Sequence, residues 1–378
     1  WLINNAKPNT AEAPKLVSSS LTWEKIKSTN IGLDVAALNN RLTGSFDYFI
    51  RKTEDMMGPG IELPAALGTN VPPTNNTDMK TYGWEIQIGW RDQIGDFKYG
   101  AKLSLSDSQS KILRYGNPTG SLSKYVEGEL IGNIYGYTTI GIAKTDEEMQ
   151  QHLASLPNGG QSALGSQWAA GDIMYADLNG DGKINNGSYT INDMGDMKKI
   201  GNSTPRFMTG INLDAAYKGW DLQMFWQGVL KRDWWPGDKN MTFWGVTDGE
   251  WWSTSFKEHL DYFRTSENPL GENLNSYYPR PIFNTKNNKS QTRYLQNAAY
   301  MRLKNIQVGY TFPKVWINKL MLQNLRIFVS GENLLTITSL SDTMDPETCG
   351  AGYQSNEQAN GTVYPLAKTI SFGLSVNF

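Results

Sequence analysis

The chain has 378 residues, of which 19% are charged, and a formal net charge of −2. This balance gives no electrostatic reason to expect a binder of nucleic acid or of an anionic membrane surface. A single cysteine, Cys349, excludes an intrachain disulfide framework and a thiolate metal cluster. The two histidines, His152 and His259, lie far apart in the sequence, so neither a His-based zinc site nor a His-dependent catalytic triad is expected.

The chain starts at Trp1 without an initiator methionine or a basic and then apolar leader, which predicts that it begins inside a longer protein. No stretch reaches the roughly 18 apolar residues of a membrane-spanning helix. Aromatic residues make up 12% of the chain and glycines number 37. This composition is typical of β-strands that are apolar on only one side.

Alternation of apolar and polar residues predicts nine strands. They are expected at 29–38, 41–53, 82–92, 97–112, 204–217, 220–229, 300–314, 325–338 and 369–378. In the last strand, Ile370, Phe372 and Leu374 alternate with small or polar residues. In 82–92, Trp84 and Trp90 stand at the two ends of an apolar row.

The connections between these strands alternate between short and long. The short ones are expected at 39–40, 93–96, 218–219 and 315–324, and the long ones at 54–81, 113–203, 230–299 and 339–368. Every second connection of an antiparallel meander lies at the same end, so all tight turns gather at one rim and all long loops at the other. This asymmetry is typical of transmembrane β-barrels. The predicted fold class is therefore all-β, an antiparallel transmembrane β-barrel with long extracellular loops.

A soluble β-sandwich would also alternate apolar and polar residues, so a loop-rich soluble β-protein stays open as the alternative. Single-chain bacterial barrels have an even number of strands, and both sheet edges must be paired in lipid. Nine strands cannot close alone. Further strands are therefore expected upstream.

Several blocks of the sequence are similar to a known family. They are Leu21-Thr22-Trp23-Glu24, Asn30 to Asp34, Asn39 to Tyr48, Tyr217 to Leu222, Tyr300 to Asn305, Gly331 to Thr336 and Tyr364 to Phe378. In this order, and over nearly the whole chain, they resemble the C-terminal half of SusC/RagA-type TonB-dependent outer-membrane transporters of Bacteroidota.

The resemblance implies a barrel of about 22 strands. Residues 29–378 would supply roughly the last nine strands, and 1–28 would be the remnant of an extracellular loop. The plug domain, the motif that meets TonB and the earlier strands would precede them. The implied function is TonB-dependent import of an oligomeric nutrient through the cell outer membrane, together with a SusD-like surface lipoprotein. Among cargoes, the resemblance favours a glycan over an oligopeptide.

One loop in the connection 113–203 resembles the first half of an EF-hand calcium loop. Its predicted ligands are Asp177, Asn179, Asp181 and the backbone carbonyl of Lys183. Ser188 stands where a bidentate glutamate is usual, so a further acid would have to complete the shell. The acids available are Asp172, Asp193 and Asp196. The alternative is a metal-free turn, because Asp, Asn and Gly also dominate turns. We expect a structural Ca²⁺ that cross-links this long loop.

A cluster of tryptophans marks the connection 230–299. It consists of Trp234, Trp235, Trp244, Trp251 and Trp252, interleaved with Asp233, Asp238, Asp248 and Glu250. Aromatic faces stack on sugar rings and carboxylates accept hydrogen bonds from hydroxyls, so these tryptophans are candidates for contact with cargo or with the lipoprotein lid. The competing interpretation, which the sequence favours, is that they form the hydrophobic core of the loop.

The same alternation assigns nine polar side chains to the barrel interior: Glu85, Gln87, Arg91, Lys98, Lys102, Asp221, Gln223, Arg326 and Glu332. Their mixed signs argue against a pore selective for one charge. The terminal aromatic residue Phe378 resembles the signal that the barrel assembly machinery reads, and we expect it to act in biogenesis.

The sequence does not match the common enzyme motifs. Gly182-Lys183 is followed by Ile184 rather than Ser or Thr, and no Gly-x-Ser-x-Gly elbow occurs. Acid pairs such as Asp233 and Asp238 could in principle serve a glycosidase. A soluble or surface-attached glycan-binding or glycoside-hydrolase β-protein is therefore the second candidate. We expect no enzymatic activity and no nucleic-acid partner.

Overall fold

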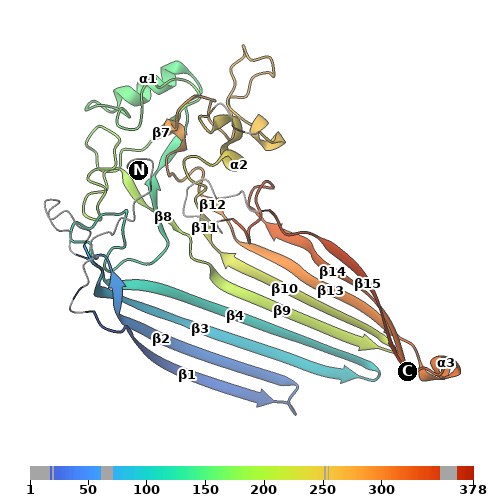
Figure 1. Ribbon diagram of the computed structural model, residues 1–378. Coiled ribbons are helices and arrows are strands. Elements are labelled where there is room, and N and C mark those ends of the chain that lie inside the picture. The colour runs from blue at the N-terminus through green and yellow to red at the C-terminus, as the bar shows by residue number, and fades with distance from the viewer. Residues whose placement is uncertain (1–17, 19–20, 61–70, 251–252, 254, 350–363) are drawn as a thin grey trace, which may run out of the picture.

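The computed structural model describes residues 18, 21–60, 71–250, 253, 255–349 and 364–378. Its main feature is one antiparallel sheet of nine strands in the order β1-β2-β3-β4-β9-β10-β13-β14-β15 (Figure 1). The strands are β1 (Lys25–Ala37), β2 (Leu42–Gly58), β3 (Thr74–Ile94), β4 (Phe97–Arg114), β9 (Arg206–Tyr217), β10 (Trp220–Lys231), β13 (Tyr300–Thr311), β14 (Asn324–Thr338) and β15 (Thr369–Asn377). The sheet is a meander, since each of these strands pairs with the next one along the chain.

All nine strands expected from the alternation are present, and this part of the prediction is confirmed. The largest difference lies in β2 and β3, which pair beyond the predicted ends through Gly58 and Thr74. Regular alternation stops before these ends, because the register shifts at Met56 and Met57 and their partners Thr77 and Asn75 are polar, so periodicity alone could not find them. β1 begins at Lys25, and residues 25–28, assigned from sequence to the preceding loop, are thus part of the sheet.

The register gives the sheet one apolar and one polar face. A representative apolar row runs across five strands through Val35, Gly44, Ile88, Leu103 and Ile211. A representative polar row runs through Arg91, Gly100, Asp214, Gln223 and Gln307. The polar face also carries the other side chains that the sequence assigned to the interior, because they alternate with the apolar rows on the same strands.

The apolar face is uncovered in the part of the chain that the structure describes. Leu33 is 62% exposed, Ile88 47% and Phe372 81%. These residues lie on strands at the first edge, in the interior and at the last edge of the sheet. The exposure is therefore a property of the whole face rather than of one edge.

The two ends of the sheet differ as predicted. Tight connections lie at 38–41, 95–96 and 218–219, and the same end carries 312–323 with α3 (Lys314–Ile317) and η5 (Asn318–Leu320). The longer connections are 59–73, 115–205, 232–299 and 339–368. In Figure 1 the long loops that hold β7, β8, α1 and α2 lie beyond one end of the sheet, and α3 lies at the other.

The long loops contain short elements that the sequence did not reveal. They are the pairs β5 (Asn133–Tyr137) with β8 (Met197–Asn202), β6 (Thr139–Ile142) with β7 (Ile173–Tyr175), and β11 (Asp233–Trp234) with β12 (Gln296–Asn297), and the helices α1 (Asp146–Ala154), α2 (Met241–Trp244), η2 (Gly245–Thr247), η3 (Lys257–Leu260) and η4 (Lys286–Asn288). Thr145 caps α1 by accepting a hydrogen bond from the Glu148 backbone N–H. Among the described residues, no helix has the length and apolar character needed to cross a membrane.

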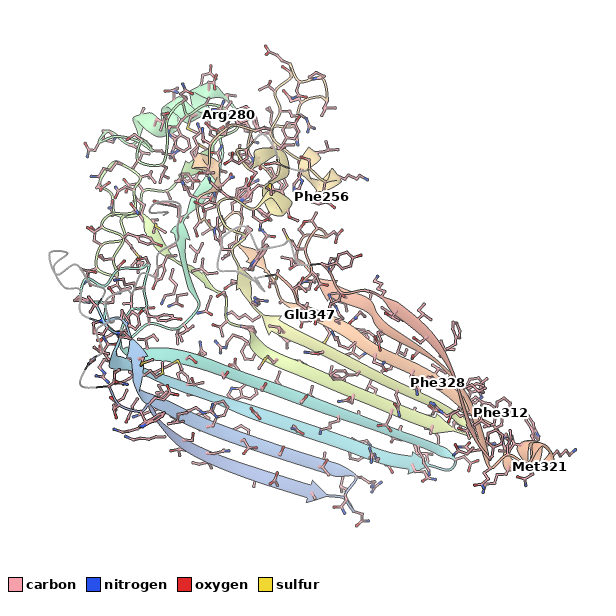
Figure 2. The ribbon with its side chains drawn as sticks, in the orientation of Figure 1. Phe256, Arg280, Phe312, Met321, Phe328 and Glu347 are labelled. Carbon is pink, nitrogen blue, oxygen red and sulfur yellow. The ribbon has the colours of Figure 1, made fainter. Side chains whose placement is uncertain are left out.

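The sheet packing at Gly373 generates a first prediction. Gly373 lies opposite Phe328, which Figure 2 marks on β14, and a Cβ at position 373 would lie 2.0 Å from the ring. Gly373→Val should therefore lower the free energy of unfolding by about 1–3 kcal/mol, as overpacked sites do. The matched control is Gly44→Val, because a Cβ there meets its nearest atom only at 3.7 Å. Urea unfolding in detergent micelles measures both, and equal midpoints would contradict this packing.

Candidate functional site

The two longest loops, 115–205 and 232–299, fold together into one body at the long-loop end of the sheet. Their shared core is aromatic and includes Trp168, Tyr175, Trp234, Phe243, Trp244, Tyr278 and Tyr294. The rings of Trp244 and Tyr294 lie 4.8 Å apart at 76°, an edge-to-face contact. Long loops need such a core to hold one conformation, since they lack the ladder of the sheet.

A buried acid joins the two loops. The Asp172 carboxylate, at 0% exposure, accepts hydrogen bonds from Arg280 Nε at 2.8 Å and Arg280 Nη2 at 2.9 Å. Lys286 Nζ lies 2.8 Å from the same carboxylate and 4.5 Å from the Trp168 ring. Asn287 Nδ2 donates to Asp172 at 2.9 Å. Asp172 belongs to the first loop and its partners Arg280, Lys286 and Asn287 to the second, and Figure 2 shows Arg280 within the loop body.

The charge on Asp172 is stable in this setting. Burial alone would raise the pKa of Asp172, but hydrogen bonds from Arg280, Asn287 and Lys286 outweigh it and hold the pKa below its ordinary value. The carboxylate therefore stays ionised at neutral pH. It acts as a fixed anionic anchor between the loops.

The structure buries two of the candidate tryptophans. Trp234 is 3% exposed and Trp244 is 0% exposed. Trp244 also packs edge-on against Phe243 at 4.8 Å and against Trp235 at 6.2 Å. Trp234 and Trp244 cannot stack on a ligand in this conformation, whereas Trp235 is half-buried. Trp251 and Trp252 lie outside the described residues.

A tyrosine-lined pocket opens at the start of loop 115–205, and sequence reasoning missed it. Its volume is about 350 Å³. It is lined by Tyr115, Tyr125 and Tyr135, by the polar residues Ser123, Lys124, Glu129 and Asn133, and by apolar residues that include Ile112 and Leu122. Tyr115 and Tyr125 meet edge to face at 5.3 Å, and Tyr125 is 50% exposed.

Glu129 organises the polar side of this pocket. Its Oε2 accepts hydrogen bonds from Lys199 Nζ at 2.6 Å and from Asn133 Nδ2 at 2.7 Å. Burial and the Glu129 carboxylate raise the pKa of Tyr135, whose hydroxyl lies 3.4 Å from Oε2. That hydroxyl therefore keeps its proton at neutral pH. The pocket offers aromatic faces beside fixed donors and acceptors, which suits a polar ligand with hydroxyl or amide groups.

The predicted calcium loop is a tight turn held by its own oxygens. The two Asp177 carboxylate oxygens accept from Gly180 N–H at 2.7 Å and Gly182 N–H at 2.9 Å. Asn179 Oδ1 accepts from Asp181 N–H at 3.0 Å, and Asp181 Oδ1 from Lys183 N–H at 3.1 Å. The side chains at alternate positions thus fold back on the loop, with Gly180 and Gly182 at positive φ.

Of the three acids that could complete a metal shell, Asp196 is the one beside the loop. It accepts from Leu178 N–H at 2.9 Å and its carboxylate interacts with that of Asp177. Asp172 forms ion pairs with Arg280 and Lys286, and Asp193 accepts a hydrogen bond from the Ser188 hydroxyl. No group of three or more His, Cys, Asp or Glu side chains arranged to hold a metal occurs in the described ranges.

Phe378 follows the end of β15 and is 85% exposed. The strand expected over 369–378 thus ends one residue earlier than the alternation predicted, and Phe378 is as exposed as Phe372 within the strand. On the polar face, Arg326 Nε lies 3.0 Å from Asp221 Oδ2. Opposite charges of the predicted interior are thus paired in at least this case, which is consistent with a wall of mixed sign.

Comparison with known proteins identifies the fold. TonB-dependent receptor P3 of Formosa agariphila is 29% identical over 100% of this chain, and the TonB-dependent receptor SusC of Bacteroides thetaiotaomicron is 24% identical over 97%. The solved RagAB peptide transporter superposes on 95% of the chain with a TM-score of 0.68 at 20% identity. The resemblance to SusC/RagA-type TonB-dependent transporters is confirmed. No family model matches the chain.

These similarities cover only part of each SusC-type relative. The chain spans 36% of receptor P3, 33% of SusC and 36% of the solved RagAB chain. The nine-stranded sheet therefore corresponds to part of their barrel, in agreement with the fold class expected from the sequence.

Asp172 and its partners Arg280, Lys286 and Asn287 form a clamp between the two loops, which we call the loop clamp. It generates a second prediction. Asp172→Asn removes the anion shared by Arg280 and Lys286 and leaves Lys286, 2% exposed, without its counter-charge. We expect the loop body to lose about 3–5 kcal/mol of stability. Hydrogen exchange of the amides of 115–205 and 232–299 measures it, with Asp193→Asn, an exposed acid of the same loop, as the control.

The pH dependence of the clamp follows from the lowered pKa of Asp172. Its stabilisation is fully present above the unfolded pKa of about 3.9 and is lost as the pH falls through the lower folded value. Exchange protection in the wild type should therefore fall only in strong acid. Equal protection in wild type and Asp172→Asn at neutral pH would show that the clamp does not hold the loops together.

Proposed function

We propose that this chain is part of an outer-membrane channel that actively imports oligomeric nutrients in a TonB-dependent manner. The observation that carries the proposal is a nine-stranded antiparallel sheet whose apolar face is exposed while its other face is polar. In water, such an uncovered face would be an aggregation site. Against acyl chains it is stable, and the polar face then lines a water-filled interior.

The difference between the two ends of the sheet supports an orientation of the chain in the outer membrane. Tight turns at one end and folded loops at the other match periplasmic turns and extracellular loops of bacterial barrels. The chain is then a multi-pass β-barrel segment of the cell outer membrane. Its polar interior gives the cargo a hydrated path, and the loop body stands at the outer mouth.

The partners follow from the relatives, which are named as TonB-dependent receptors and as part of the RagAB transporter. TonB would act on a plug domain encoded elsewhere in the complete protein. A SusD-like lipoprotein would cover the mouth and contact the loop body, where Trp235 is a candidate for contact with the lid or the cargo. Phe378, exposed beside the last strand, would serve the barrel assembly machinery.

We favour a glycan as cargo over an oligopeptide. The support is the tyrosine-lined pocket, because aromatic faces beside Glu129 and Asn133 suit sugar rings and their hydroxyls. The pocket belongs to the loop that leaves β4, at the end assigned to the cell exterior. The protein performs no covalent chemistry on the cargo in this proposal.

Uptake by intact cells tests the function. Disrupting the gene should abolish accumulation of fluorescent oligosaccharides from the organism's growth substrate, and an uncoupler should do the same in the wild type because TonB draws on the proton gradient. Tyr115→Ala with Tyr125→Ala should reduce uptake at low cargo concentration by about 10-fold or more, as loss of stacking does. If these changes abolish uptake of oligopeptides instead, the cargo is a peptide. Uptake that survives both gene disruption and the uncoupler would refute import.

We also propose that the loop at Asp177 binds structural Ca²⁺. Asp177, Asn179, Asp181 and the Lys183 carbonyl would supply oxygens, and Asp196 is the acid placed to add another. Both oxygens of Asp177, Asn179 Oδ1 and Asp181 Oδ1 each accept one backbone N–H and still have a lone pair to offer. The ion would fasten the loop and take no part in transport.

Isothermal titration provides the calcium test. Sites of this extracellular type bind with dissociation constants on the order of 10⁻⁴ to 10⁻³ M. Asp177→Ala should abolish the heat signal and the calcium-dependent rise in Tm, whereas Ser188→Glu should tighten binding by restoring the missing bidentate ligand. An identical Tm with calcium and with chelator in the wild type would end this hypothesis.

A further inference from the structure

Four lysines stand opposite one another across the first four strands of the sheet. The register pairs Lys27 with Lys52, Lys52 with Lys80, and Lys80 with Lys111. Because directly paired residues of antiparallel strands project from the same face, the four ammonium groups form one row. Strands lie about 4.8 Å apart, so the row extends over roughly 14 Å.

This lysine row lies on the apolar face. The register between Lys80 and Ile94 has no irregularity, so Lys80 alternates in phase with Trp84 and Ile88. Lys52 is likewise in phase with Tyr48. The row is at the long-loop end of this face, beyond the aromatic side chains Tyr48 and Trp84. Lys80 Nζ lies 5.5 Å above the ring of Tyr82, which is the next residue of its strand on that face.

Three acids that flank this row on the same face are paired with bases outside the row. Asp55 binds Lys25 at 3.2 Å and Arg114 at 3.1 Å, and Asp78 binds Arg114 at 2.8 Å. Asp107 is held by Arg206.

Lys27, at the edge of the row, forms an ion pair with Glu54, in which Lys27 Nζ lies 2.5 Å from Glu54 Oε2. Lys52, Lys80 and Lys111 make no ion pair with any described residue. Lys52 is exposed, and Lys80 and Lys111 are half-buried.

Such an arrangement has a cost, because like charges directly opposite each other destabilise a sheet. An external anion that bridges neighbouring lysines would remove the repulsion. The position of the row indicates which anion this is. The row borders an exposed apolar surface and the aromatic side chains Tyr48 and Trp84, and lipid headgroups lie at this level of a membrane protein. Lysine is a compact point charge that binds phosphate well.

We propose that Lys52, Lys80 and Lys111, with Lys27 at the edge, bind the phosphate groups of an anionic lipid in the outer leaflet. The inference rests on the proposed function, since it takes the apolar face to be the lipid-facing one. It adds a lipid site on the outer wall, away from the cargo path. The lipid's acyl chains would lie along the apolar rows below Tyr48 and Trp84.

Lipid binding to the complete protein in detergent tests the proposal by native mass spectrometry. The probes are phosphatidylglycerol and the zwitterionic phosphatidylcholine. Wild type should prefer phosphatidylglycerol, and Lys80→Gln with Lys111→Gln should weaken that binding about 30-fold, at roughly 1 kcal/mol per lysine. The matched control is Lys98→Gln with Lys102→Gln, which removes the same charge from the opposite face of β4. Lys80→Arg with Lys111→Arg should bind like the wild type.

Three results would overturn the lysine site: equal binding of the two lipids by the wild type, retention of phosphatidylglycerol by the glutamine variant, or an equal loss in the control. Phosphatidylglycerol binding by the wild type should also weaken as NaCl is raised, and this measurement needs no variant. Salt-independent binding counts against the site. Folding is checked by heat-modifiable gel mobility. A wild type that needs no detergent and lacks this mobility would refute the barrel itself, and the lipid site with it.

Discussion

The structure depends on one constraint, the two-residue alternation of side chains along fully paired antiparallel strands. Once the ladder of β1 to β15 is formed, every second residue must share a face, and the register carries this division across all nine strands. A one-residue slip would exchange Ile86 and Ile88 for Glu85 and Gln87. The apolar face, the polar wall and the lysine row all follow from this single geometric rule.

The long loops are stabilised by different interactions from those of the sheet. They lack a ladder, and an aromatic core with the buried Asp172 anchor holds 115–205 and 232–299 together. The loop body combines a rigid interior with the half-open tyrosine pocket. In the proposed importer, such a body could receive cargo or a lid without rearranging the sheet beneath it.

Sequence reasoning predicted the parts governed by local periodicity. The nine strands, their order and the alternation of short and long connections are all evident in the residues. It also favoured a loop core built from the tryptophans, and Trp234 and Trp244 are indeed buried. It could not predict that Asp172 would meet Arg280, because this contact joins residues over a hundred positions apart. The tyrosine pocket is formed by residues 112–135 and was missed for a different reason, because that segment has no regular apolar alternation from which its fold could be predicted. The lysine row also escaped notice: a net charge of −2 hides it, and only the register brings Lys52, Lys80 and Lys111 together.

The central claim, that the apolar face touches lipid and the polar face touches water, can be measured directly on β3. A spin label carried in turn at positions 85 to 88 of the complete protein in lipid bilayers reports its collisions with oxygen and with a water-soluble nickel chelate. The account predicts that labels at 86 and 88 collide mainly with oxygen, and labels at 85 and 87 with the chelate. Access of the chelate to all four positions, or the absence of a two-residue period, would contradict it.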